Sequence, residues 1–241
     1  MKYAILSDIH SNIESLQSVI KFLEPKNIDC YLCLGDIVGY GANPLECSDL
    51  IGALCPTIIL GNHDAGTAGI MPLSHFNSYA SDAIIWTKSR INKETAAFLK
   101  DLPLIYKEKD FTLVHGTLEE PQKFNYLIDM DSAKKSFDLM ESDLLFVGHT
   151  HVPGVFEKNN KKVRYYFNNR VMLKKNRKYI VNAGSVGQPR DGDQRACVVL
   201  YDSKKKEIRF ERVEYDIDSA SSKIKKSGLS DKLADRIRTG M

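Results

Sequence analysis

The first sixty residues alternate short apolar runs with helical patterns, and this alternation restricts the fold more than any other feature of the sequence. The apolar runs of strand length are residues 2–6, 31–34 and 57–60, and the segments with apolar residues at helical spacing are 13–23 and 44–54. Ser11 and Glu14 have the spacing of a capping box before the first helix, and Pro25 ends that helix. Parallel strands need a crossover connection such as a helix, so this order predicts a mostly parallel sheet.

The rest of the chain predicts further helices and a second sheet. Helical patterns cover residues 75–90, 93–100 and 131–140, and apolar runs at 104–106, 111–114 and 144–147 are strand-like. Beyond Gly154, strand-like runs follow without helices between them, at 155–156, 163–167, 179–181, 196–201 and 208–213, and they predict a second, antiparallel or mixed sheet. The tail, residues 218–241, is polar and helical and shows no core of its own. We expect one domain over residues 1–241, with the tail packed on it.

Composition excludes several classes of protein. With 241 residues, of which 43% are hydrophobic and 27% charged, the chain is globular rather than disordered or fibrous. No apolar run reaches the roughly 18–20 residues that span a bilayer, and the N-terminal run is too short for a signal peptide. The five scattered cysteines favour a reducing compartment. Cys30 and Cys33 form a C-x-x-C pair in a strand-like run, where they would point to opposite faces, so a zinc or redox site is disfavoured. We expect a cytoplasmic protein with no membrane partner.

Five of the six histidines lie directly after an apolar run or in the loop just beyond one. In a doubly wound sheet, ligands bind outside the carboxyl ends of the strands, so these loops are expected to meet at one edge. The residues of these loops that can bind a metal are Asp8, His10, Asp36, Asn62, His115, His149 and His151. Asp8 and His10, like His149 and His151, are two residues apart, which in extended backbone places both side chains on one face.

This set of side chains predicts a site for two metal ions. Carboxylate, imidazole and amide oxygen suit hard or borderline divalent ions, and seven ligands exceed what one ion normally uses. Two ions roughly 3.5–4 Å apart that share one carboxylate would use the whole set. The two aspartates offset only half of the charge of two divalent ions, so the site would attract a phosphate anion and lower the pKa of a bound water. Glycines at positions 35, 61, 116 and 148 leave room for close approach.

Five motifs occur in order along the chain: D-x-H at Asp8, G-D-x-x-G-Y at Gly35, G-N-H-D at Gly61, H-G at His115 and G-H-T-H at Gly148. Together they resemble the calcineurin-like metallophosphoesterase superfamily, in particular its small bacterial and archaeal phosphodiesterases and its diadenosine-tetraphosphatase-like members. The resemblance runs from Asp8 to His151 and on through residues 182–193. It implies an α/β fold, a four-layer α/β/β/α sandwich of two mixed sheets flanked by helices.

The resemblance also implies a role for each motif residue. One metal would be held by Asp8, His10 and His151, the other by Asn62, His115 and His149, and Asp36 would bridge the two. The ions would be divalent manganese, iron, zinc or nickel, with manganese favoured. His63 would protonate the leaving group as general acid, and Asp64 would orient its imidazole. The implied activity is hydrolysis of a phosphodiester, a phosphomonoester or a dinucleoside polyphosphate by a metal-activated hydroxide.

Two further residues are candidates for contact with the substrate. Arg190 lies in a polar, Gly-rich loop after a strand-like run, and its guanidinium suits bidentate contact with a phosphate oxygen; the alternative is an ordinary turn. Tyr40, in the second motif, either stacks on a nucleobase or simply covers the loop. His75 lies outside all five motifs and is interpreted as a structural residue.

The net charge of +3 is unevenly distributed. Residues 158–178 carry nine cations, and the rest of the chain has more acids than bases. Such a stretch is more often a solvated hairpin than a funnel for a polyanion, so we expect a small phosphorylated or nucleotide substrate rather than nucleic acid. Two alternatives stay open: a nuclease that uses this stretch, and a catalytically weak or inactive metal-binding scaffold. The sequence leaves the oligomeric state and the identity of the metal undetermined.

Overall fold

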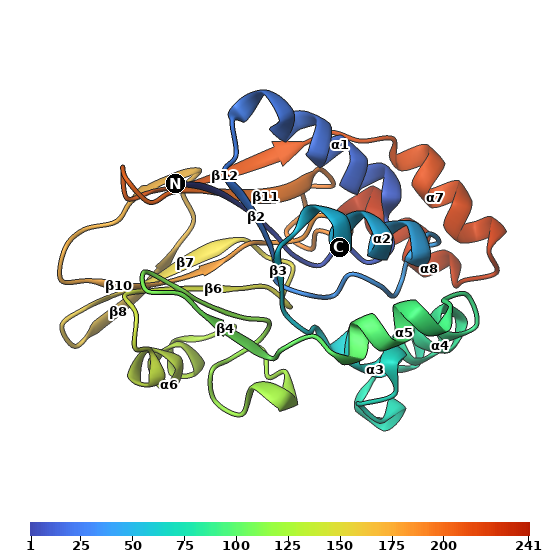
Figure 1. The fold of residues 1–241 in the computed structure, drawn as a ribbon, viewed down its shortest axis with the longest axis horizontal. Coiled ribbons are helices and arrows are strands. Elements are labelled where there is room, and N and C mark those ends of the chain that lie inside the picture. The colour runs from blue at the N-terminus through green and yellow to red at the C-terminus, as the bar shows by residue number, and fades with distance from the viewer.

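Two six-stranded sheets and eight helices make up the computed structural model, which describes residues 1–241 (Figure 1). The strands are β1 (Lys2–Leu6), β2 (Cys30–Cys33), β3 (Thr57–Ile58), β4 (Ile105–Lys107), β5 (Thr112–Val114), β6 (Leu144–Val147), β7 (Gly154–Asn159), β8 (Lys162–Tyr166), β9 (Arg170–Met172), β10 (Lys178–Asn182), β11 (Ala196–Asp202) and β12 (Glu207–Val213). The helices are α1 (Ile13–Leu23), α2 (Pro44–Leu54), α3 (Asn62–Ala68), α4 (Ser78–Lys88), α5 (Lys93–Lys100), α6 (Met130–Leu139), α7 (Ile217–Lys226) and α8 (Asp231–Thr239). The first sheet has the strand order β3-β2-β1-β11-β12-β9, and the second has the order β4-β5-β6-β10-β7-β8.

Side chains alternate along the strands between two cores, and this alternation produces four layers. In β1, Ala4 and Leu6 belong to the core under α1 and α2, whereas Ile5 belongs to the core between the sheets. In β6, Phe146 lies between the sheets, whereas Leu145 belongs to the core under α6. Strands that are buried on both faces have near-continuous apolar sequences, and β1 and β6 show this pattern. The predicted four-layer α/β/β/α sandwich of two mixed sheets is confirmed.

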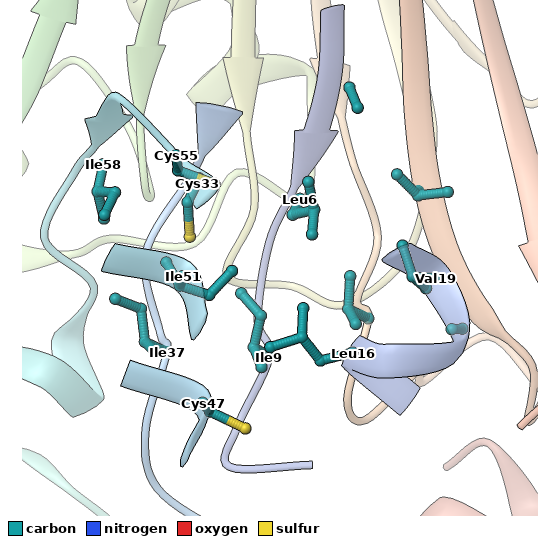
Figure 2. Packing of buried hydrophobic residues seen from close by; sticks show 14 of the residues in the cluster. Leu6, Ile9, Leu16, Val19, Cys33, Ile37, Cys47, Ile51, Cys55 and Ile58 are labelled. Carbon is teal, nitrogen blue, oxygen red and sulfur yellow. The ribbon is translucent and has the colours of Figure 1, made fainter. Parts of the chain in front are cut away.

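The core between the first sheet and its helices contains the apolar face that the sequence predicted for α1. Leu16 and Val19 of α1 lie in one cluster with Leu6 and Ile9, and Ile51 of α2 joins it from the other side (Figure 2). All five side chains are fully buried. Burying such a side chain contributes roughly 1.5–3 kcal/mol to folding, so this core fixes α1 and α2 on the sheet that carries the first two motif loops.

The two sheets interleave along the chain, although the sequence predicted a separate second sheet from the strands beyond Gly154. β1, β2 and β3 pair in parallel, but β11 pairs antiparallel with β1 and extends the first sheet through β12 to β9. β5 and β6 join the second sheet instead, where β10 pairs in parallel with β6. Apolar runs predict strands but do not name their partners, because pairing is decided by contacts distant in sequence.

Several local predictions also differ from the structure. The N-cap of α1 is Asn12, whose side chain accepts a hydrogen bond from the Ser15 N–H at 3.1 Å, so the capping box predicted at Ser11 is wrong. Ser11 has a left-handed φ of 53° and belongs to the preceding loop. The strand β9 and the helix α3 were not predicted. They are only three and seven residues long, which is too short to show the apolar periodicity of a strand or a helix. Cys30 and Cys33 do pack against different cores, as expected for opposite faces of a strand.

The C-terminal helices α7 and α8 bury an apolar face of their own, which the sequence analysis did not find. Ile224, Leu233 and Ile237 of this helix pair lie in one cluster with Ala83 of α4 and with Tyr40. The indole N–H of Trp86 donates a hydrogen bond to the backbone carbonyl of Ser227 at 3.0 Å. The tail therefore packs on the loop of the second motif.

None of the helices combines the length and the apolar character that a membrane span requires.

Ion pairs hold four of the nine cations of the basic segment 158–178. Glu157 is buried and accepts hydrogen bonds from Arg164, Arg177 and Tyr166. Lys158 pairs with Asp138, Arg170 pairs with Glu207, and the Lys178 ammonium donates to the Met140 carbonyl at the end of α6. The segment covers the end of β7, then β8, β9 and the start of β10, and its lysines at 161, 162, 174 and 175 form no ion pair.

Replacing Phe146 by Ala is expected to destabilise the protein by about 3–5 kcal/mol, because it removes a buried ring between the sheets and leaves a cavity. Phe146 contacts Phe111 and Tyr201 with ring centroids 5.8 and 5.7 Å apart. Urea unfolding measures the effect. Ile128→Ala, at a side chain that is 69% exposed, is the control and should change stability by less than about 0.5 kcal/mol. Similar losses in both variants would contradict the assignment of this core.

Candidate functional site

Loops at the carboxyl ends of strands from both sheets meet at one edge of the sandwich. The candidate metal ligands in these loops are Asp8 and His10 after β1, Asp36 after β2, Asn62 at the start of α3, His115 after β5, and His149 and His151 after β6. All seven side chains are buried, with at most 8% exposed. The structure therefore brings together residues that are up to 143 positions apart, from His151 back to Asp8. Burial of so many polar groups in one place requires partners for each of them.

Three groups of side chains place their ligand atoms within 4.8 Å of one another. The groups are Asp8, His10 and His151; Asp36, His115 and His149; and His10, Asp36 and His63. Asp36 links the first two groups, because its Oδ2 lies 3.6 Å from His10 Nε2 and 3.3 Å from His115 Nε2. Six of the seven candidate ligands are thus gathered in two adjacent groups with the Asp36 carboxylate between them, and Asn62 is buried outside these groups.

Each carboxylate directs one oxygen to the backbone side and the other into the cluster. Asp8 Oδ2 accepts hydrogen bonds from the Ser7 hydroxyl at 2.5 Å and from the His149 N–H at 3.0 Å. Its Oδ1 faces His151 Nε2 at 3.3 Å. Asp36 Oδ1 likewise accepts from the His63 N–H at 2.8 Å, which leaves Oδ2 for the imidazoles. The outward bonds fix both carboxylates in the orientation that a metal ligand needs.

Backbone carbonyls fix the imidazoles in the same way. The Nδ1 atoms of His10, His115 and His151 lie 3.1, 2.7 and 2.5 Å from the carbonyl oxygens of Val38, Leu34 and Gln188. A carbonyl only accepts, so each Nδ1 carries the proton and each neutral ring has its lone pair on Nε2. His10 Nε2 and His151 Nε2 face each other at 3.1 Å. Two lone pairs at that distance repel unless a cation lies between them.

The polar atoms that lack partners point to the same place. Asp8 Oδ1, Asn62 Oδ1 and His115 Nε2 are buried side-chain atoms without a hydrogen-bond partner in the protein. All three are acceptors when the histidine is neutral, and an unpaired buried acceptor costs about 1–3 kcal/mol. A divalent cation satisfies such atoms directly, and carboxylate, imidazole and amide oxygen are the ligands it prefers. The residues present therefore fit the metal ions expected from the sequence.

Burial keeps most of the histidines neutral. Burial lowers the pKa of His63 to about 4 and that of His149 to about 3, and it holds the pKa of His10 and His151 well below the ordinary value. The positive charge of Arg190 acts in the same direction on all four rings. Neutral imidazoles are the form that binds metals, so the environment prepares them as ligands.

The carboxylates supply negative charge to the centre of the cluster. Burial acts to raise the pKa of Asp36, but His115, His63 and His10 outweigh it and hold the pKa of Asp36 well below its usual range. Burial also acts to lower the pKa of His115, yet Asp36 and Asp8 raise it to about 9. Burial raises the pKa of Asp8 to about 7. The cluster thus attracts positive charge.

The backbone of the site is held in left-handed conformations. Asp8, His10, Asp36, His149 and His151 have φ angles between 48° and 66°, a region that residues other than glycine seldom adopt. The extended backbone predicted for both pairs is therefore wrong, because the chain has already left the strand. Asp8 and His10 still point into one group, whereas His149 and His151 point into different groups. Strain of this kind is typical of functional sites that the surrounding fold enforces.

Two glycines allow the carboxylates to approach the neighbouring backbone. A Cβ atom at Gly61 would overlap Asp36 Oδ1, and one at Gly148 would overlap Ser7 Oγ and lie 2.6 Å from Asp8 Oδ2. Any side chain at either position would push the carboxylate out of the cluster. The expectation that these glycines leave room at the site agrees with this geometry.

His63 lies beside the cluster, and Asp64 does not contact its imidazole. Asp64 Oδ1 accepts hydrogen bonds from the N–H groups of Ile37 and Val38 at 2.9 and 3.2 Å, and Oδ2 accepts from the Gly61 N–H at 3.2 Å. The Nδ1 of His63 has no hydrogen-bond partner. The predicted orienting role of Asp64 is therefore wrong: its carboxylate ties the loop after β2 to the start of α3.

Aromatic packing orients His63 instead. Its ring centroid lies 4.3 Å from that of Tyr40 and 5.5 Å from that of Phe76. Tyr40 is only 5% exposed and also contacts His10, so it covers the loop rather than offering a free face. Neither Phe76 nor Tyr126, which stacks on His149 at 4.0 Å, was found from the sequence. Both lie in segments without a motif, and only the fold brings them to the site.

Arg190 approaches the cluster from the loop after β10. Its Nη2 donates a hydrogen bond to Gln188 Oε1 at 2.9 Å, and its guanidinium carbon lies 5.7 Å from the centre of the Tyr40 ring. Its Nε is buried without a partner. A guanidinium held by a neutral amide keeps its full positive charge available beside the neutral histidines.

His75 is exposed on a short 3-10 helix and contributes to none of the three ligand groups.

A double sheet sandwich with a buried histidine and aspartate cluster at the strand ends defines a class of metal-dependent phosphoesterases. The domain model described as the calcineurin-like phosphoesterase superfamily domain matches residues 1–206, and the chain belongs to this family. Calcineurin-like phosphoesterases use divalent metals, and the ligand groups described above are the candidates to bind them. The family and its structural neighbours are phosphoesterases, which places this chain among the hydrolases in general.

Known relatives share the family and the fold. An uncharacterised protein of Methanocaldococcus jannaschii is 41% identical, and the match covers 98% of this chain and 97% of the relative. The crystal structure of a metallophosphoesterase from Sphaerobacter thermophilus matches with a TM-score of 0.89 at 32% identity, over 100% of both chains. The crystal structure of a putative diadenosine tetraphosphatase matches with a TM-score of 0.54 at 14% identity, over 88% of this chain and 94% of that one, which shows the fold alone.

Asp64→Ala is expected to lower the free energy of unfolding by about 2–4 kcal/mol, because it leaves three buried N–H groups without an acceptor. Asp64→Asn is the matched control: it keeps an oxygen for Ile37 and Val38 and should cost about half as much. Thermal or urea unfolding in metal-free buffer measures both variants. An Asp64→Ala protein of unchanged stability that loses activity only toward poor leaving groups would instead restore the orienting role.

Proposed function

We propose that the protein is a dinuclear metal-dependent phosphoesterase that hydrolyses phosphodiesters, phosphomonoesters or dinucleoside polyphosphates. The observation that carries the proposal is the pair of ligand groups that share Asp36, together with the unpartnered acceptors aimed between them. When bound, two divalent cations would act as Lewis acids on water and on the phosphate oxygens. Asp8, His10 and His151 are proposed for one ion, Asn62, His115 and His149 for the other, and Asp36 for both.

The remaining polar side chains have roles that follow from their position. Arg190 has a buried, unpartnered Nε beside the cluster, and we assign it to a non-bridging phosphate oxygen. His63 lies at the edge of the ligand groups, beside His10 and Asp36, and we assign it to pass a proton to the leaving oxygen. His63 is neutral in the protein alone, and an anionic phosphate beside it raises the pKa of the ring and favours the protonated form.

Features away from the cluster support a small substrate in a reducing compartment. No residue of the basic segment 158–178 lines the pocket beside His63, and three of its arginines are held by Glu157 and Glu207, which favours a small substrate over the nuclease alternative. All five cysteines are free, which supports the proposed cytoplasmic location. Manganese is the proposed metal because the ligand set contains carboxylate and amide oxygens and no thiolate.

The metal content provides the first test. The protein saturated with manganese should bind about two ions per chain, and Asp36→Ala should lose both, because a bridging ligand serves each ion. Elemental analysis after gel filtration measures the stoichiometry. The control is Asp110→Ala, which removes a surface carboxylate that pairs with Lys206 and should leave the metal content unchanged. One ion per chain, or full occupancy in Asp36→Ala, would contradict the shared carboxylate.

The leaving-group dependence tests His63. His63→Ala should keep its metals but lose roughly 10²–10⁴-fold in kcat on alkyl phosphate esters, whose alkoxide needs a proton. On p-nitrophenyl phosphate the loss should stay under about tenfold, because nitrophenolate leaves without one. Steady-state kinetics on both esters give the comparison. Equal losses would remove His63 as the acid, and a manganese-loaded wild-type protein without activity on any ester would favour the scaffold alternative.

A further inference from the structure

A pocket of about 270 Å³ opens directly beside the metal ligands, on the side of His63. Asn62, His63 and His149 form its inner wall. Its outer walls come from residues 71–80, between α3 and α4, and from residues 123–126, before α6. The volume is close to the lower limit of about 300 Å³ for small-molecule sites. Because the phosphate would be held by the cluster itself, this space receives whatever group is esterified to it.

The lining of the pocket suits a planar aromatic group without positive charge. None of its 13 lining residues is acidic, and six are hydrophobic. Tyr126 stacks on His149 with an angle of 16° between the rings, and its side chain is still 51% exposed, so its second face is open at the mouth. Phe76 lines the opposite segment with its ring at 69° to His63. Open aromatic faces of this kind stack on nucleobases.

Polar side chains at the rim of the pocket can donate hydrogen bonds to the heteroatoms of a bound ring. Asn77 uses its Oδ1 as the N-cap of α4, accepting from the Ala80 N–H at 3.0 Å, which leaves its amide N–H groups free. Asn125 contributes a second exposed amide, whereas the Lys123 ammonium at the mouth pairs with Glu120. A purely hydrocarbon ring would leave these donors unused, whereas a base offers them acceptors.

We propose that this pocket binds the nucleoside of a nucleoside monophosphate and that the nucleoside is the leaving group. The inference rests on the proposed function and names its substrate class, with Phe76 and Tyr126 as specificity-determining residues. His63 lies in the wall of the pocket, so the proton donor and the departing oxygen are on the same side. A water oxygen forms the new bond to phosphorus, the P–O bond to the sugar breaks, and the sugar oxygen takes the proton. The products are the nucleoside and inorganic phosphate.

The size of the pocket distinguishes a mononucleotide from a polynucleotide. No residue of the basic segment 158–178 lines it, so a group held in the pocket does not contact that segment. A polynucleotide needs a cationic groove along its backbone, whereas one nucleoside needs only the pocket.

The test compares substrates that differ only in the base. Manganese-loaded protein should hydrolyse 5′-AMP or 3′-AMP with a kcat/KM about 10- to 100-fold above that for ribose 5-phosphate, since stacking is worth about that factor per base. Tyr126→Ala should bring the ratio of the two kcat/KM values below about threefold, and Tyr126→Phe should keep it. Phe76→Ala, on the other wall, should lower the same ratio; the ratio is compared because both rings also pack on histidines of the site. Tyr165→Ala, at an exposed ring outside the pocket, is the control and should behave as wild type.

A binding measurement separates this inference from the proposed function. Adenosine should bind to metal-free protein in calorimetry, and Tyr126→Ala should weaken that binding about tenfold or more. Hydrolysis of p-nitrophenyl phosphate with equal kcat/KM for AMP and ribose 5-phosphate would overturn the nucleoside pocket and leave the phosphoesterase intact. Absence of all hydrolysis with tight adenosine binding would overturn the proposed function and support the pocket. Preference for an oligonucleotide over AMP would overturn the mononucleotide assignment.

Discussion

The structure depends on holding two buried carboxylates and several neutral imidazoles within a few ångströms of one another. Such groups lose their hydration on folding, and the protein replaces it with hydrogen bonds from the backbone side: Ser7 and the His149 N–H on Asp8, the His63 N–H on Asp36, and carbonyls on the imidazole Nδ1 atoms. These bonds use one atom of each side chain and leave the other pointing inward. The unpartnered inner atoms are what a divalent cation satisfies.

The two sheets enforce this arrangement. Strands β1 to β3 of the first sheet and β5 and β6 of the second end at the same edge, so the loops that follow converge from both layers. Left-handed φ angles at Asp8, Asp36 and His149 carry strain that a free loop would relax. The apolar cores on both faces of each sheet supply the stability that keeps the strand ends in place, and the tail adds support under Tyr40.

Sequence reasoning identified the ligand cluster better than the groups around it. The alternation of strands and helices placed the polar loops at strand ends, and the ordered motifs named seven candidate ligands, all buried, of which the structure gathers six in adjacent groups. It failed where a side chain's partner is decided by three-dimensional contact. Asp64 binds the backbone after β2 rather than His63, Asn12 caps α1 in place of Ser11, and Tyr40 is buried by α7 and α8. Phe76 and Tyr126 carry no local signal at all.

The sequence by itself determined the family and the residues proposed to bind the cations, because residue type and spacing within a motif are local properties. It also determined the near-continuous apolar strands that a sandwich with two buried sheets requires. Only the tertiary structure decided which strands pair, which oxygen of each carboxylate faces inward, and which aromatic rings line the pocket beside His63. Those features depend on contacts between segments far apart in the chain, and the free energy that selects them belongs to the packed molecule rather than to any one segment.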